Sequence, residues 1–276
     1  MKIGVLHPGA MGETIVACLA QNAHELYWCS KGRSSATARR AELAGATGLA
    51  TLDELVELCE LIVSVCPPIA ARAQAAAVSA AGYAGVYLDA NAISPQTAAA
   101  IADLFEGRYI DGGIIGPPAK VAGTTRLYVS GPGAVDVVGL FGRGALESRL
   151  VDARLNSASA LKMCYAAYTK GSIALLLATR ALAESEGVGD VLESEWEQSQ
   201  PGLNQRLLGS AAGVSPKAWR FVDEMHEIAQ TFAARDLPAD FHLGAAATYA
   251  RLHRFKDDPT KQLSEVLAEL LNPPAV

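Results

Sequence analysis

Lys162 is the residue of this chain best suited to chemistry, because it stands in an apolar helical stretch, ALKMCY over 160–165. A lysine in such a setting has two interpretations. Its stem can lie along apolar neighbours while the ammonium group reaches water, or it can be a desolvated group that gives and takes a proton. The local sequence alone favours the first interpretation.

Two further segments place polar or glycine-rich backbone at the predicted ends of strands. Residues 89–97, DANAISPQT, run into a helix that Ser94 caps ahead of a proline at its first position. Residues 111–118, DGGIIGPP, are predicted to be the end of a strand followed by a glycine-rich loop. Glycine-rich backbone can offer N–H groups to a carboxylate or carbonyl oxygen, so both segments are candidates for contact with a substrate.

The first residues of the chain predict a loop that binds a dinucleotide. Residues 2–12, KIGVLHPGAMG, are an apolar run that opens onto glycines and leads into a helical stretch. Backbone N–H groups at such a helix N-terminus can face a pyrophosphate. The pattern is a variant of G-x-G-x-x-G, because His7 stands at the first glycine position. The residues predicted to contact the cofactor here are His7, Gly9, Ala10, Met11 and Gly12.

The end of the second predicted strand favours NADP. Residues 29–35, CSKGRSS, contain no acid, whereas NAD-binding folds place one roughly 20 residues past the glycines to hold the ribose hydroxyl. Lys31, Arg33 and the hydroxyls of Ser30 and Ser34 would bind a 2′-phosphate instead. The alternative is a solvated basic turn.

Two more strand ends complete the predicted cofactor site. Cys66 and Pro67 lie in the turn SVCPP over 64–68, which can line the ribose or the nicotinamide or can simply be a strand stopped by proline. Asn91 follows the next strand and is predicted to contact both cofactor and substrate.

Composition narrows the classes of partner. The chain has 276 residues, is 50% hydrophobic and carries a formal net charge of −6, which argues against a nucleic-acid or anionic-membrane partner. Its five cysteines show no C-x-x-C spacing and no histidine cluster. We therefore expect reduced thiols in a cytoplasmic protein, with no metal site and no transmembrane segment.

The pattern of elements predicts two domains. The predicted strands are residues 3–6, 25–29, 61–65, 86–89, 109–111 and 127–130. The predicted helices among them are residues 11–22, 34–44, 52–58, 69–81, 95–105 and 133–141. This alternation is typical of an α/β Rossmann-like, doubly wound parallel sheet, which we place at 1–153. An all-α domain is predicted at 154–276, with helices at 158–186, 191–198, 202–211, 216–234, 239–254 and 260–271.

Taken together in order and spacing, these features resemble the β-hydroxyacid dehydrogenase family, which includes 6-phosphogluconate dehydrogenase, hydroxyisobutyrate dehydrogenase and the imine reductases. The resemblance covers nearly the whole chain. It looks closest to a 6-phosphogluconate dehydrogenase-like subgroup with a C-terminal helical domain of unknown function, through residues 160–171 and 219–232. It implies a Rossmann domain, a helical domain and a homodimer formed through the helical domain.

The resemblance also implies roles for single residues. Lys162 matches the catalytic lysine, which takes the proton from a substrate hydroxyl as hydride leaves the same carbon for NADP. Asn91 and Ser94 match the substrate-binding loop. The residues that match the loop around the substrate carboxylate are Gly112, Gly113 and Ile114.

Two departures from the family pattern predict a more apolar pocket. Ala166 stands four residues after Lys162, where the family has asparagine, and Ile115 replaces a serine of the substrate loop. Missing polar partners change substrate choice strongly. Replacement contacts could come from Tyr165, Tyr168, Met225 or His226, whereas Lys170 is expected to be a surface residue.

Three functions fit this pattern. The first is an NADP-dependent dehydrogenase or reductase acting on a hydroxyl/carbonyl pair of a small molecule. The second is NADPH-dependent imine reduction, although imine reductases usually have an acid or a tyrosine where Lys162 stands. The third is a non-catalytic NADP-binding sensor or interaction protein.

Overall fold

The computed structural model describes residues 1–272, which form two compact units, one at Met1–Met163 and a second that begins at Cys164. The division falls inside the longest helix, α7 (Ser157–Ser185). The predicted domain boundary between residues 153 and 154 stays a prediction.

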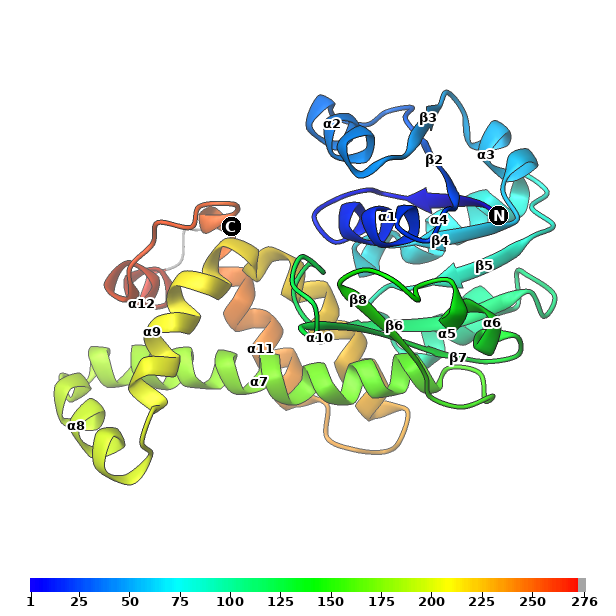
Figure 1. Cartoon of the computed structure of the whole chain (residues 1–276). Coiled ribbons are helices and arrows are strands. Elements are labelled where there is room, and N and C mark those ends of the chain that lie inside the picture. Colours follow the sequence, from blue (N-terminus) through cyan, green and yellow to red (C-terminus); the bar gives the residue numbers. More distant parts are fainter. Residues whose placement is uncertain (273–276) are drawn as a thin grey trace. The chain divides into compact units, whose positions relative to one another are not determined.

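The first unit is built on one eight-stranded sheet (Figure 1). Its strands are β1 (Lys2–Leu6), β2 (Glu25–Cys29), β3 (Thr47–Leu49), β4 (Leu61–Ser64), β5 (Val86–Asp89), β6 (Tyr109–Ile115), β7 (Thr125–Ser130) and β8 (Leu146–Leu150). The order across the sheet is β3-β2-β1-β4-β5-β6-β7-β8. All neighbours are parallel except β6 and β7, which run antiparallel.

Helices cover both faces of this sheet. They are α1 (Gly12–Ala20), α2 (Ser35–Ala44), α3 (Leu52–Leu58), α4 (Pro68–Ala80), α5 (Pro95–Ala102) and α6 (Ala134–Gly139). One core cluster joins the sheet to α1, α2 and α6, through Ile15, Ala41 and Val137 among others. The other joins it to α3, α4 and α5, through residues such as Leu55 and Ala71. The predicted Rossmann-like, doubly wound fold is therefore confirmed.

The structure corrects three details of the predicted sheet. Strands β3 and β8 were not predicted, because both are edge strands with largely exposed side chains and so lack an apolar pattern. The sheet is not wholly parallel. Strand β6 does not end at Asp111 but continues through both glycines to Ile115, because β7 pairs with it along that length.

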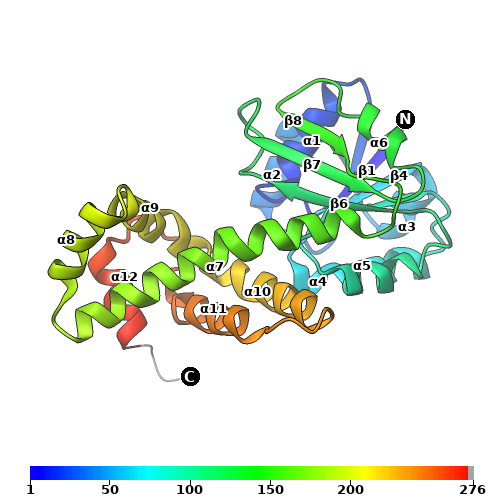
Figure 2. The ribbon, with the colours of Figure 1, turned by 90° about the horizontal axis from the view of Figure 1, so that it is seen from below.

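The second unit is helical, as predicted (Figure 2). Its helices after α7 are α8 (Gly189–Ser199), α9 (Leu203–Val214), α10 (Ala218–Ala233), α11 (Asp240–Arg251) and α12 (Leu263–Leu271), with short 3-10 turns at Ser215–Lys217 and His253–Phe255. Helices α10 and α11 pack against each other, with Phe221 edge-on to Tyr249 at 5.3 Å between ring centroids. No helix within residues 1–272 is long and apolar enough to cross a membrane.

Lys170 is not the surface residue that the sequence suggested. Its side chain is only 16% exposed; Nζ forms an ion pair with Glu224 and lies 3.9 Å from the centre of the Phe221 ring. The backbone carbonyl of Lys170 accepts a hydrogen bond from the Tyr249 hydroxyl at 2.7 Å. Lys170 therefore ties α7 to α10 and α11.

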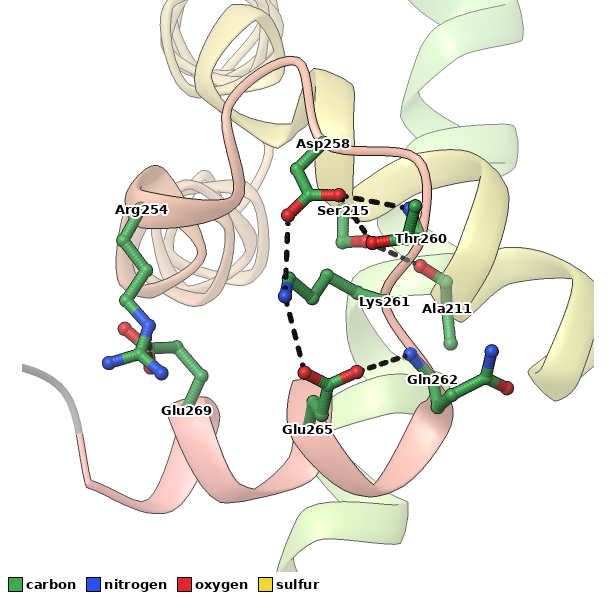
Figure 3. Close-up of polar contacts among 9 residues, drawn as sticks. All are labelled: Ala211, Ser215, Arg254, Asp258, Thr260, Lys261, Gln262, Glu265 and Glu269. Carbon is green, nitrogen blue, oxygen red and sulfur yellow. Dashed lines mark hydrogen bonds and ion pairs between the residues drawn. The ribbon is translucent and has the colours of Figure 1, made fainter.

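A small polar network holds the start of α12 (Figure 3). Lys261 Nζ lies 3.3 Å from Asp258 and 3.2 Å from Glu265, and Glu265 accepts the backbone N–H of Gln262 at 3.0 Å. Because Glu265 is three residues into the helix, this contact closes a capping box. The network is structural and lies in the helical unit.

Candidate active site at the carboxyl edge of the sheet

The central strands present their carboxyl ends in one row. Strand register aligns Leu6 with Ser64, Ser64 with Asp89, and Asp89 with Asp111. The residues that follow these positions therefore share one edge of the sheet. Strands β1 and β4 are adjacent while the chain leaves them in opposite directions, and such a switch point is where open α/β sheets bind ligands.

The loop from β1 to α1 has the backbone that a dinucleotide site needs. His7 adopts a left-handed conformation, with φ of +62°, and its carbonyl accepts the N–H of Gly9 at 2.7 Å. A Cβ on Gly12 would lie 2.5 Å from the His7 carbonyl oxygen, so packing requires glycine there. A Cβ on Gly9 would meet no protein atom closer than 3.9 Å. Packing therefore leaves Gly9 unconstrained, and the residue fits a backbone that a ligand approaches closely.

His7 is neutral at physiological pH. Burial lowers the pKa of the imidazole to about 4, and the positive charge of Arg33 adds to the effect.

The loop after β2 exposes its basic side chains. Lys31 and Arg33 are exposed. The hydroxyl of Ser30 donates to the Leu49 carbonyl at 2.9 Å, and Ser34 caps α2 by accepting the N–H of Thr37 at 3.3 Å. The two serines thus shape the turn that presents the two cations.

Asn91 joins the ends of β4 and β5. Its side-chain oxygen accepts the N–H of Cys66 at 2.6 Å, and its amide nitrogen donates to the Ser64 hydroxyl at 3.0 Å. Only 2% of Asn91 is exposed. Its observed role is to hold two strand-end turns together, while its predicted contacts with cofactor and substrate stay predictions.

Cys66 is a thiol that stays protonated. Burial raises its pKa to about 12, and the negative charge of Asp89 adds to the effect. A thiolate nucleophile is therefore not available at this position. Pro67, which is exposed, precedes α4.

Ser94 acts as the cap of α5. It is fully buried, and its hydroxyl oxygen accepts the N–H of Thr97 at 3.1 Å. The predicted capping is confirmed. The predicted substrate contact of Ser94 stays a prediction.

The two glycines of β6 are required by close packing. A Cβ on Gly112 would lie 2.7 Å from the Asp89 carbonyl oxygen. A Cβ on Gly113 would lie 2.8 Å from the Ala158 carbonyl oxygen and 2.9 Å from Cβ of Lys162. Glycine at 113 thus lets the first turns of α7 lie directly against β6. Ile114 and Ile115 are buried, and whether this segment cradles a carboxylate stays a prediction.

This contact places Lys162 at the carboxyl edge of the sheet. Lys162 belongs to the first compact unit, together with the glycine loop and the β6 strand. The structure therefore brings the proposed proton-transfer residue and the predicted cofactor loops onto one unit.

Tyr165 and Met225 belong to the helical unit. Tyr165 is 46% exposed on α7, whereas Met225 on α10 has no exposed surface. Ala166, where the family pattern has asparagine, is also buried. Substrate contacts by Tyr165 and Met225 stay predictions.

A buried polar cluster beside Lys162 was not predicted from the sequence. Asp111 on β6 accepts hydrogen bonds from the backbone N–H of Ser159 at 2.8 Å and from the Ser159 hydroxyl, and from the Ser130 hydroxyl at 2.9 Å. Burial raises the pKa of Asp111, and the hydrogen bonds oppose that rise. A serine pair at 157 and 159, just where the helix begins, was the available signal.

Residues 183–252 match a family described as a domain of unknown function, DUF1932. An uncharacterized 28.5 kDa protein of Methanothermus fervidus is 27% identical over 218 residues, covering 76% of this chain and 84% of that protein. A conserved protein of unknown function with structural similarity to 3-hydroxyacid dehydrogenases superposes with a TM-score of 0.67 at 25% identity, covering 92% of this chain and 98% of that one.

The fold is that of the hydroxyacid dehydrogenases. Mycobacterium tuberculosis 3-hydroxyisobutyrate dehydrogenase superposes with a TM-score of 0.69 at 19% identity, over 98% of this chain and 99% of that one. A reductive aminase of Aspergillus terreus, in complex with NADPH and ethyl levulinate, gives 0.56 at 19% identity, over 97% and 98%. The resemblance predicted from the sequence is confirmed, and these structural relatives are oxidoreductases.

Proposed function

We propose that this protein is an NADP-dependent oxidoreductase that moves hydride between NADP(H) and a hydroxyl/carbonyl substrate, with Lys162 as general acid and base. The observation that carries the proposal is the packing of Lys162 against Gly113, at the sheet edge that also holds the glycine loop. The dehydrogenase and NADPH-bound reductase among the structural relatives support it.

The cofactor loops fit a dinucleotide through three features of this chain. Gly9 offers backbone that packing leaves open, Lys31 and Arg33 offer exposed cations, and residues 29–35 contain no acid. These cations would hold the 2′-phosphate that distinguishes NADP from NAD. When bound, the nicotinamide would accept or supply the hydride.

Lys162 would manage the proton. In the oxidation direction its neutral Nζ takes the hydroxyl proton while the substrate carbon gives up hydride, which leaves a carbonyl and an ammonium group. In the reduction direction the ammonium returns that proton to the oxygen. The buried Ile115 and Ala166, in place of polar family residues, favour a substrate with few polar groups.

A second candidate function is imine reduction, which the likeness to the reductive aminase favours. It uses the same cofactor site and delivers hydride to a C=N carbon. A lysine at 162 favours the carbonyl reaction over this one.

Absorbance of NADPH tests both functions with probes of each class. These are 3-hydroxyisobutyrate and L-serine with NADP⁺, ethyl levulinate with NADPH, and cyclohexanone plus allyl amine with NADPH. We expect ethyl levulinate, which has the fewest polar groups of the three hydroxyl/carbonyl probes, to be turned over faster than 3-hydroxyisobutyrate and L-serine. Turnover confined to the ketone–amine mixture would favour the imine reductase, and turnover with no probe, alongside tight NADPH binding, would favour a sensor.

Substitution of Lys162 tests its role. Lys162→Ala should lower kcat about 100-fold or more, as loss of a general acid/base does, and should leave NADPH affinity measured by calorimetry unchanged. Lys217→Ala removes an exposed lysine of the helical unit and serves as the control.

Arg33→Ala should weaken NADP binding about tenfold, the effect of losing one charge-assisted hydrogen bond, and leave NAD binding unaltered. A clear preference of the wild type for NAD would contradict the cofactor assignment.

We also propose that the protein is a homodimer formed through its helical unit and that its partners are small molecules. Leu175 and Leu182 lie seven residues apart on one face of α7 and are 53% and 60% exposed, and Phe241 on α11 is 51% exposed. Apolar side chains of this size on one unit are typical of a buried interface.

A further inference from the structure

Helix α7 is not capped by the side chain that precedes it, because the side-chain oxygen of Asn156 has no hydrogen-bond partner. The residue before it, Asn156, has a left-handed backbone with φ of +70°, and its carbonyl accepts the first intrahelical hydrogen bond from Ala160 at 3.0 Å. The first N–H groups of any helix lack intrahelical partners and need other acceptors when they are buried. Ala158 and Ser159 are both buried.

The sheet supplies those acceptors. The N–H of Ala158 donates to the Ser130 hydroxyl at 2.9 Å, and the N–H of Ser159 donates to the Asp111 carboxylate at 2.8 Å. Ser130 in turn donates to Asp111 at 2.9 Å. Both orphan N–H groups are therefore satisfied by side chains from β6 and β7, and a carboxylate at a helix N-terminus also complements the helix dipole.

The same strand fixes the next turn of the helix. Asp111 and Gly113 are two residues apart on β6, so their Cα–Cβ directions lie on one face of the sheet. Asp111 accepts a hydrogen bond from Ser159. Gly113 lies against Ala158 and against Lys162, which is three residues after Ser159 on the helix. Two adjacent points of attachment set both the position of α7 along β6 and its rotation.

We propose that Asp111, assisted by Ser130, is a positioning residue that caps α7 from the sheet and thereby holds Lys162 in place against Gly113. It touches neither substrate nor cofactor in this role. The inference rests on the proposed function only for the catalytic role of Lys162. The capping of α7 and the placement of Lys162 can be tested whether or not the protein has that function.

The test compares four variants of the full-length protein. Asp111→Ala removes the acceptor of the Ser159 N–H. Asp111→Asn keeps the shape of the side chain and one oxygen that can accept this bond. Ser130→Ala removes the acceptor of the Ala158 N–H and is the milder change if Asp111→Ala does not fold. Thr51→Ala is the matched control, because Thr51 caps α3 by accepting the N–H of Glu54 at 3.2 Å.

Two measurements report on the helix start and on the lysine. Amide hydrogen exchange at Ala158 and Ser159 reports the cap. The rate at which N-hydroxysuccinimidyl acetate acetylates Lys162, relative to Lys217 in the same molecule, reports its placement. Asp111→Ala should raise both rates about tenfold, because it leaves the buried N–H of Ser159 without its acceptor. Ser130→Ala should act in the same direction, and Asp111→Asn should restore most of the wild-type values.

The control separates positioning from general stability. Thr51→Ala should lower the melting temperature and alter neither rate. The proposal is overturned if the folded Asp111→Ala or Ser130→Ala protein shows wild-type exchange at Ala158 and Ser159 and wild-type acetylation of Lys162. Raised rates in a protein whose wild type turns over no probe would uphold the placement and reject the proposed function.

Discussion

At the scale of single residues, Gly9 and Gly12 share a loop but are under different constraints. Glycine at 12 is needed because the His7 carbonyl lies where a Cβ would be. Glycine at 9 is not needed by any protein contact nearer than 3.9 Å. The proposed cofactor is therefore what would approach the backbone at Gly9.

Alanine at each glycine distinguishes these constraints. Gly12→Ala should destabilise the protein by about 1–3 kcal/mol, as overpacking does, and should also weaken NADPH binding. Gly9→Ala should leave the denaturant midpoint unchanged while it lowers NADPH affinity. Urea titration and calorimetry measure the two effects. A Gly9→Ala protein that binds NADPH as tightly as the wild type would contradict the assignment of this loop.

His7 predicts a pH dependence of stability. Its pKa is about 4 in the folded protein and 6.5 ordinarily, so between these values the unfolded chain binds a proton that the folded protein does not. The free energy of unfolding should therefore fall as the pH is lowered from 6.5 to 4.

His7→Asn removes this titration and tolerates the left-handed backbone. Chemical denaturation of both proteins across that range should show the wild type losing stability relative to the variant as the pH falls. Parallel curves would mean that His7 titrates normally.

At the scale of elements, the sequence predicted the helices and the buried strands well, because apolar runs and proline or serine caps mark them locally. Edge strands β3 and β8 were missed because their side chains are mostly exposed. The extension of β6 was missed because Gly112 and Gly113 look like breakers in isolation. Only the tertiary structure shows that one faces the backbone of β5 and the other faces α7.

The candidate site was likewise predictable only where its residues lie in segments with a local sequence signal. Loops such as 7–12 and 29–35 carry local signals, and the structure brings their strand ends to one edge. The serines at 157 and 159 mark the start of α7 locally, but its acceptor Asp111 lies 48 residues before Ser159, so the sequence does not show which group accepts the bond. Asn91 was predicted as a ligand contact, whereas its bonds to Cys66 and Ser64 could be seen only in the folded structure.

Gly113 gives a prediction about how β6 and α7 pack. Gly113→Ala places a Cβ within 3 Å of the Ala158 carbonyl and of Lys162, so it should destabilise the protein by about 2 kcal/mol or more. The control is Gly139→Ala in α6, where a Cβ meets nothing within 4 Å.

Gly139→Ala should stabilise the protein by about 0.5–1 kcal/mol, the helix preference for alanine over glycine. Thermal unfolding of the two variants measures both effects. Equal melting temperatures would show that α7 does not lie as close to β6 as the structure indicates.

At the scale of the whole molecule, the proposed homodimer predicts a mass in solution twice that of the chain. Leu175→Glu places a charge on an exposed apolar position of α7 and should shift the protein to the monomer. Light scattering coupled to gel filtration measures the mass. Val135→Glu, at an apolar position on α6 of the first unit that is 63% exposed against 53% for Leu175, should leave the mass unchanged. A wild-type protein that elutes as a monomer at every concentration would contradict the proposal.

The cap on α7 also bears on the order in which the chain folds. Its acceptors are 28 and 48 residues earlier in the chain than the amides they bind, so these bonds close long loops. Contacts of high sequence separation form slowly, and they need β6 and β7 already paired. We expect the start of α7 to be among the last segments to become ordered during refolding. The lysine would then acquire its setting only in a molecule whose sheet is complete.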